Sequence, residues 1–238
     1  MDSLKNKNLS FDKISNILTL RYDPNNQSTL KKINGNDFLP KSSVNLNKIK
    51  DILKNSIQTK LNSQSNLTVA LSGGVDSTLL LSLTKELFPD IHITAITITF
   101  PYSDDESESA ANIAHHFDID HKIIHVDNFL KELPTAISIL KEPYYDVMNW
   151  YYLVKNTSSA SNILLTGDGA DEIFGGYTFR YSKFLEKITD NSSPIEKVKA
   201  YLECHERDWV PDQENIFEKK LGFSWNKIYD TLEPFFNN

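Results

Sequence analysis

Short apolar runs alternate with stretches of helical spacing through the middle of this chain. Strand signals lie at 67–71, 96–100, 121–126 and 163–165, of which 67–71 and 163–165 are apolar runs. Apolar residues at helical intervals predict helices over 45–60, 76–88, 105–117, 127–140 and 147–160. Strands that alternate with helices in this way are typical of an α/β fold with a doubly wound parallel sheet. We expect a five-stranded sheet flanked by helices.

The two ends of the chain have a different character. Residues 1–44 are rich in Asn, Lys and Ser and show little periodicity, which predicts a loop-rich lead with short ordered pieces at 18–22 and 37–40. Helical spacing returns at 183–188, 194–206 and 225–236. We therefore expect three segments: the lead at 1–44, the α/β domain at 45–180 and a short helical C-terminal extension at 181–238.

A glycine turn, Ser72-Gly73-Gly74-Val75-Asp76-Ser77, joins the first apolar run to the helix that follows it. The N-terminus of a helix offers unpaired N–H groups and the positive end of its dipole to an anion. Two glycines let the backbone approach a phosphate closely, and two serines add hydroxyl groups. Asp76 would repel a phosphate unless a divalent cation lay between them, which indicates Mg²⁺.

A second turn follows the apolar run 163–165. It reads Thr166-Gly167-Asp168-Gly169-Ala170-Asp171-Glu172, and it continues to Gly175-Gly176-Tyr177. In an open parallel sheet, ligands bind at the carboxyl ends of the strands. Because both turns follow strands, we expect them on the same edge, where one supplies donors for phosphate and the other supplies carboxylates for a metal ion or a proton.

Together the two turns resemble the synthetase domain of the asparagine synthetase family, within the ATP-pyrophosphatase superfamily. The Ser-Gly-Gly-x-Asp-Ser turn and the Gly-Asp-Gly-Ala-Asp-Glu segment that ends in Gly-Gly-Tyr carry the resemblance, which covers residues 45–180 best. It implies the fold of the adenine nucleotide alpha hydrolases. It also implies that ATP and Mg²⁺ take part in the reaction.

The chemistry that this resemblance implies is amide formation driven by ATP. A carboxylate, aspartate by default, attacks the α-phosphorus to give an acyl adenylate and pyrophosphate, and ammonia or an amine then displaces AMP. Asp76 and Asp171 would hold Mg²⁺, Asp171 also counts as catalytic, and Asp168 would orient the amine or take its proton. The contacts with ATP are assigned to Leu71, Ser72, Gly73, Gly74, Asp76, Ser77, Ile98, Thr166 and Gly167.

Composition narrows the classes of partner. The net charge of −7 argues against broad nucleic-acid binding. No apolar run approaches the length of a membrane span, and the single cysteine, Cys204, fits a reducing cytoplasm. Large members of the family begin with a glutamine-hydrolysing cysteine, whereas residue 2 here is Asp. We therefore expect free ammonia, a separate glutaminase subunit or another amine as the nitrogen source.

Two other functions stay open at this point. One is an ATP-pyrophosphatase that acts on tRNA or on another small metabolite, which the acidic turn disfavours. The other is a non-catalytic ATP-binding subunit that regulates or scaffolds a partner, which we base on the short C-terminal extension. A homo-oligomer is also left open.

Overall fold

The computed structural model describes residues 10–25, 45–61, 64–101, 105–128, 130–141, 147–205 and 222–237. The chain divides into two compact units. Residues 40–174 form the first, here called the sheet unit. Residues 1–39 together with 175–238 form the second, here called the helical unit. The predicted three-segment division remains a prediction about functional domains.

The sheet unit contains four parallel strands in the order β3-β2-β1-β4. They are β1 (Asn66–Ala70), β2 (His92–Thr99), β3 (Asp120–His125) and β4 (Leu164–Leu165). The prediction of five strands is wrong for the described part of the chain. After β4 the chain turns into the short helix α7 (Ala170–Phe174) and then into further helices, so no later segment that the structure describes joins the sheet.

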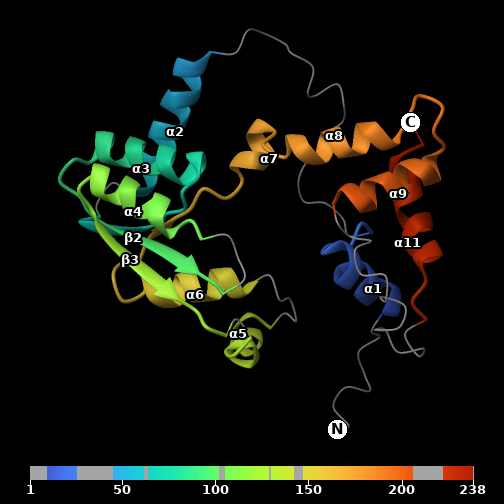
Figure 1. Ribbon diagram of the computed structural model, residues 1–238, viewed down its shortest axis with the longest axis horizontal. Coiled ribbons are helices and arrows are strands. Elements are labelled where there is room, and N and C mark those ends of the chain that lie inside the picture. Colours follow the sequence, from blue (N-terminus) through green and yellow to red (C-terminus); the bar gives the residue numbers. More distant parts are fainter. Residues whose placement is uncertain are drawn as a thin grey trace. The chain divides into compact units, whose positions relative to one another are not determined.

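Helices cover both faces of this sheet, which confirms the doubly wound α/β fold (Figure 1). Helices α2 (Leu46–Leu61), α3 (Val75–Leu87) and α4 (Ser107–His116) lie on one face, and α5 (Leu133–Leu140) and α6 (Val147–Thr157) lie on the other. Side chains of β2 alternate between the two cores. Ile93 and Ala95 pack in the core with α2, α3 and α4, whereas Ile98 packs beside Met148 and Tyr152 of α6.

The helices of the sheet unit begin and end close to their predicted positions, with one exception. Helix α5 begins at Leu133, where the spacing predicts a start at 127. The chain first makes a turn in which the side chain of Asn128 accepts a hydrogen bond from the N–H of Leu130 at 3.1 Å. Pro134 then stands in the first turn of α5. A backbone N–H in that turn would have no acceptor within the helix, so the lack of an N–H in proline costs no hydrogen bond there.

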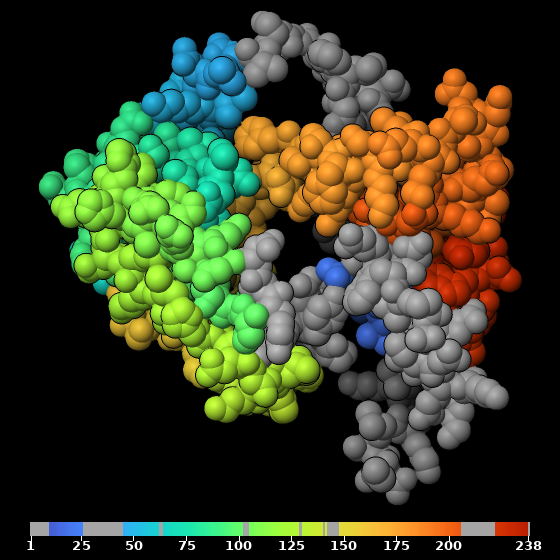
Figure 2. Space-filling view, viewed as in Figure 1, coloured from blue at the N-terminus to red at the C-terminus, as the bar shows by residue number. Residues whose placement is uncertain are grey.

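The helical unit contains α1 (Phe11–Leu20), α8 (Thr178–Lys187), α9 (Pro194–Cys204), α11 (Trp225–Leu232) and the short 3₁₀ turn η3 (Glu233–Phe235). Its core joins both ends of the chain. Leu20 of α1 packs with Val198 and Leu202 of α9 and with Ile228 and Leu232 of α11. In the space-filling view, α8 and α9 appear in orange within this unit, and α3 and α4 appear in teal and green within the sheet unit (Figure 2).

Helix α1 lies in a segment for which the sequence predicts loops. Its N-terminus is capped by Ser10, whose hydroxyl accepts a hydrogen bond from the N–H of Lys13 at 3.3 Å. The helix escaped the periodicity analysis because three of its four buried residues are polar: Ser15, Asn16 and Thr19. Among the described residues, no helix combines the length and the apolar character that a bilayer span requires.

Candidate active site

The glycine turn lies at the carboxyl end of β1, a central strand of the sheet. Gly74 is the N-cap of α3, with φ −82° and ψ 162°, and no side chain caps this helix end. The N–H groups of Val75, Asp76 and Ser77 therefore have no acceptor within the helix. They form the positive end of a 13-residue helix, which is a suitable place for an anion.

The two serines of the turn hold it together from within. The hydroxyl of Ser77 accepts a hydrogen bond from the N–H of Ser72 at 3.2 Å and lies 3.0 Å from the Ser72 hydroxyl. The Ser72 hydroxyl in turn accepts from the N–H of Gly74 at 3.1 Å. Because Ser77 is only 5% exposed, its hydroxyl shapes the turn. The serines therefore preorganise the loop, and their predicted contacts with ATP stay predictions.

Gly73 is required by the close approach of α4. A Cβ atom placed on Gly73 would lie 2.7 Å from the Cβ of Ser109 and 2.9 Å from its Oγ. Real Cβ atoms essentially never come so close, so any side chain here would push α4 and the turn apart. The glycine thus lets the amino-terminal end of α4 close over one side of the turn.

Gly167 brings the second turn onto the first. Parallel pairing of Thr68 with Leu164 sets β4 beside β1, so the segment after β4 emerges next to the glycine turn. A Cβ on Gly167 would lie 3.0 Å from the Cβ of Asp76 and 3.1 Å from the backbone nitrogen of Ser77. The structure therefore brings together Gly167, Asp76 and Ser77, as expected for turns that share one edge of the sheet.

The acidic turn folds tightly after Gly167. Gly169 has a φ of +88°, which other residues adopt only with strain, and the N–H of Ala170 donates to the carbonyl of Gly167 at 3.3 Å. This turn starts α7 with Asp171 in its first turn, where Asp171 is half-buried. Asp168 is exposed. The described residues contain no group of three or more His, Cys, Asp or Glu side chains arranged to hold a metal ion, so Asp76 and Asp171 stay a predicted pair.

A buried hydrogen-bond chain supports the residue that precedes the glycine turn. The hydroxyl of Thr97 donates to the carbonyl of Leu71 at 2.6 Å, and the same hydroxyl lies 2.8 Å from Nε2 of His121 on β3. Since Thr97 has one proton, its oxygen must accept from an Nε2–H of His121. Burial lowers the pKa of His121. The Leu71 N–H also donates to the carbonyl of Ile96 at 2.9 Å, so both backbone groups of Leu71 are tied to β2.

Sequence reasoning missed Thr97 and His121. The available signal was Thr97 itself, one of three threonines that alternate with apolar residues along this strand. Such a residue needs a hydrogen-bond partner when it is buried, and Thr97 is 5% exposed. Ser109, whose side chain lies against Gly73, could not be recognised from the sequence as part of the site. It is a small residue on an exposed helix face, and such residues are common.

The remaining predicted contacts with ATP lie close to the turn in sequence or on neighbouring strands. Leu71 is 2% exposed, and its side chain packs in the core beneath α3. Ile98 packs with the core on the opposite face of the sheet. Thr166 is half-buried between β4 and Gly167. The roles of these three residues in nucleotide binding stay predictions.

Comparison with known proteins finds a family whose match includes both turns. The family described as asparagine synthase matches residues 48–228, which is most of the chain. This chain belongs to the asparagine synthase family. The resemblance of the two turns is thereby confirmed at the level of the family.

Curated relatives in the asparagine synthase family include asparagine synthetase [glutamine-hydrolyzing] 1 of Bacillus subtilis (strain 168). It is 26% identical over 160 residues, which cover 65% of this chain and 25% of that protein. Asparagine synthetase B [glutamine-hydrolyzing] of Escherichia coli (strain K12) is 28% identical over 166 residues, which cover 60% of this chain and 29% of that protein. The matched part of the chain thus spans between a quarter and a third of these relatives.

Solved structures with a similar arrangement include two synthetases. NMN synthetase from Francisella tularensis is 19% identical with a TM-score of 0.43, and the match covers 81% of this chain and 87% of that one. NH3-dependent NAD synthetase from Campylobacter jejuni subsp. jejuni NCTC 11168 is 14% identical with a TM-score of 0.42, and the match covers 81% of this chain and 94% of that one.

Proposed function

We propose that this chain is an ATP-dependent amide-forming ligase that releases pyrophosphate and AMP. The observation that carries the proposal is the close packing of Gly167 against Asp76 and Ser77. This contact joins a turn suited to phosphate with a turn rich in carboxylates, and membership of the asparagine synthase family supports a ligase. The default acyl substrate is aspartate, which we take from the names of the relatives.

The phosphate groups of ATP would bind at the N-terminus of α3. The N–H groups of Val75, Asp76 and Ser77 have no helical acceptor, and no side chain caps them. Gly73 and Gly167 let α4 and the acidic turn pack closely against this turn, which holds its backbone donors in place. A fixed set of donors of this kind stabilises the charge of departing pyrophosphate without reorganising during the reaction.

The carboxylates of Asp76 and Asp171 fit a magnesium ion by their chemistry. Both are hard oxygen ligands, and Mg²⁺ in proteins is usually held by one or two carboxylates together with substrate phosphates. When bound, the ion would neutralise charge on the phosphate oxygens. Asp76 stands in the first turn of α3 and Asp171 in the first turn of α7, so each carboxylate is borne by a helix that begins at the proposed site.

The proposed reaction has two steps. A carboxylate oxygen of the substrate bonds to the α-phosphorus, the bond from that phosphorus to the bridging oxygen breaks, and pyrophosphate leaves. The nitrogen of ammonia or an amine then bonds to the acyl carbon, and AMP leaves with the oxygen to which it was joined. Asp168, exposed beside Gly167, would accept the proton that the nitrogen loses. Ammonia would arrive free or from a separate glutaminase subunit.

The test is pyrophosphate release from ATP and Mg²⁺ by the full chain with aspartate and ammonium, against reactions that lack each component. Release that depends on aspartate, with AMP and asparagine as products, supports the ligase. Release that depends on another carboxylate, or on tRNA, would overturn aspartate as the substrate. ATP binding without release in any mixture would instead favour an ATP-binding subunit that needs a partner.

A further inference from the structure

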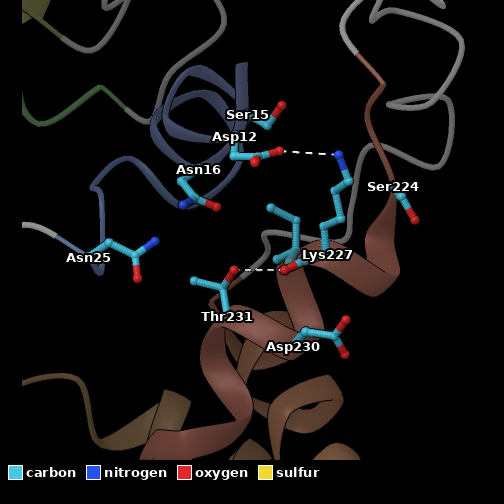
Figure 3. Close-up of a pocket in the computed structure, with 9 residues that line it drawn as sticks. Asp12, Ser15, Asn16, Asn25, Ser224, Lys227, Asp230 and Thr231 are labelled. Atoms are coloured by element: carbon cyan, nitrogen blue, oxygen red, sulfur yellow. Dashed lines mark hydrogen bonds and ion pairs between the residues drawn. The ribbon is translucent and has the colours of Figure 1, made fainter. Parts of the chain in front are cut away.

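A polar pocket of about 260 Å³ lies between α1 and α11, in the helical unit (Figure 3). Its floor includes the buried side chain of Ile228, and its other lining residues are polar or charged. Pockets for drug-sized ligands are larger, about 300–1,000 Å³, and mostly apolar. The size and lining of this pocket therefore favour a small, highly polar ligand.

The wall on α1 turns a buried polar group toward this space. Asn16 is 3% exposed, and one of its amide N–H groups donates to the carboxylate of Asp23 at 3.4 Å. Its amide oxygen points into the space between the two helices and accepts no hydrogen bond from the residues that the structure describes (Figure 3). Although the residue as a whole is buried, this oxygen is not among the fully enclosed side-chain atoms that lack a partner in the described part of the chain. It is therefore open to the pocket, where a donor from a ligand or from water can reach it.

The hydroxyl of Thr231 on α11 is a second acceptor. Its proton is used, because the hydroxyl donates to the backbone carbonyl of Lys227 at 2.7 Å. The oxygen lone pairs of Thr231 are therefore left for a donor in the pocket. The carboxylate of Asp12 stands between α1 and the side chain of Lys227, with which it pairs at 3.2 Å. Acceptor oxygens of α1 and of α11 thus line the same pocket. A protonated amine has three N–H donors and could bind to them.

Lys227 supplies the opposite charge at the same pocket. Its ammonium group has three donors and pairs with Asp12, and it is 58% exposed. It can therefore donate to a carboxylate of a ligand while it keeps its pair with Asp12. Asp12 and Asp230 place two carboxylates against this one ammonium in the lining, so an anion without an amine would be disfavoured.

We infer that this pocket binds a small zwitterion of the α-amino-acid type. The ligand's ammonium group donates to Asp12, Asn16 and Thr231, and its carboxylate accepts from Lys227. Ile228 contacts a short apolar side chain. This inference does not depend on the proposed ligase activity, because the pocket belongs to the helical unit and the glycine turn belongs to the sheet unit.

The test uses the full chain without ATP and three matched probes: L-alanine, ethylamine and propionate. Backbone amide signals of residues 15, 16, 228 and 231 are followed by NMR during each titration. We expect saturable shifts with L-alanine at millimolar concentration, as is reasonable for so small a ligand. Ethylamine lacks the carboxylate and propionate lacks the ammonium group. Each should therefore bind at least about tenfold more weakly than L-alanine, which is the effect of losing one charge-assisted hydrogen bond.

Lys227→Met keeps the stem of the side chain and removes its charge. It should weaken L-alanine binding about tenfold. Because Lys227 is an exposed surface residue, the fold should persist, which thermal unfolding would verify. Asn191→Ala changes an exposed residue of the same unit and should leave binding unaltered. Absence of saturable shifts, equal binding of ethylamine and L-alanine, or unchanged binding by the Lys227 variant would each overturn the inference.

Discussion

Gly167 lies so close to Asp76 that a Cβ atom on the glycine would stand 3.0 Å from the Cβ of the aspartate. Gly167 lies 91 positions after Asp76 in the sequence, and the pairing of β4 with β1 brings the two together. The contact fixes where the acidic turn meets the N-terminus of α3. A side chain added at Gly167 would force its neighbours to shift by a few tenths of an ångström.

Gly167→Ala should displace the backbone at Asp76 and Ser77, because the added methyl group would also lie 3.1 Å from the Ser77 nitrogen. We expect the amide signals of these two residues to shift in an NMR spectrum and pyrophosphate release to fall. Gly169→Ala is the contrasting variant. Its Cβ meets no atom within 4 Å but its φ of +88° strains the backbone, so stability should fall by about 1 kcal/mol without moving these signals. Equal shifts in both variants would contradict the crowding explanation.

Gly73 and Ser109 should be coupled energetically. Gly73→Ala places a methyl group 2.7 Å from the Ser109 Cβ, and overpacking of this kind costs about 1–3 kcal/mol of stability. Ser109→Gly removes that Cβ at the cost of a glycine on an exposed helix face, roughly 0.5–1 kcal/mol. Urea unfolding of both single variants and the double variant should show that the double variant is more stable than the sum predicts. Additive losses would mean that α4 moves away freely.

Thr97 should stabilise the strand end that carries the glycine turn. Thr97→Val removes the hydroxyl while it keeps the shape, so the Leu71 carbonyl loses a donor and the His121 N–H loses an acceptor. Leaving such groups unsatisfied costs about 1–3 kcal/mol. Thr97→Ser restores the hydroxyl and should recover most of this stability in chemical denaturation. A valine variant as stable as the serine variant would show that the hydrogen-bond chain contributes nothing.

Much of the sheet unit could be predicted from sequence because its signals are local. Buried strands such as 67–71 read as apolar runs, and each glycine turn follows one of them directly. The meeting of Gly167 with Asp76 could be predicted as a shared edge, since parallel strands place their carboxyl ends together. The distance itself could not, because it depends on which strands are neighbours.

The features that sequence reasoning missed all depend on partners that are distant in the chain. Helix α1 buries Asn16 and Thr19 on its inner side while Phe11 and Leu18 are exposed, so its apolar residues do not mark the face that packs. The role of Thr97 appears only when β3 places His121 beside it. Five strands were expected for a doubly wound sheet, although the sequence shows only four strand signals. The described chain after β4 forms helices instead of a fifth strand.

His121 should make stability depend on pH near neutrality. Burial lowers the pKa of His121 in the folded state below its ordinary value of 6.5. As the pH falls through about 6.5, the unfolded chain therefore takes up a proton before the folded protein does, and stability declines toward the lower folded pKa. Above this window the group has no effect. His121→Gln keeps an N–H donor for Thr97 without titrating, so it should flatten this decline.

The measurement for His121 is the free energy of unfolding of both proteins at several pH values between about 5.5 and 7.5, on either side of the ordinary histidine pKa. The carboxyl groups with lowered pKa values, such as Glu86 and Glu132, titrate at more acidic pH and lie outside this range. The other histidines are present in both proteins, so their contribution cancels in the difference. Identical pH dependence in the two proteins would contradict a depressed pKa at His121.

Two aspartates, Asp76 and Asp168, should separate the two steps of the proposed reaction. Asp76→Asn removes a proposed Mg²⁺ ligand and should lower pyrophosphate release by about a hundredfold or more. Asp168→Asn should leave pyrophosphate release in the first turnover largely intact and abolish amide formation, because Asp168 would act only on the attacking nitrogen. Asp90→Asn, an exposed position just beyond the other end of α3, is the matched control and should behave as the unaltered chain. The measurement is the amount of pyrophosphate and of amide product formed in parallel by each variant, which shows which of the two steps is lost. Loss of both products in the Asp168 variant would place that residue in the first step, and near-normal activity of the Asp76 variant would remove the metal from this turn.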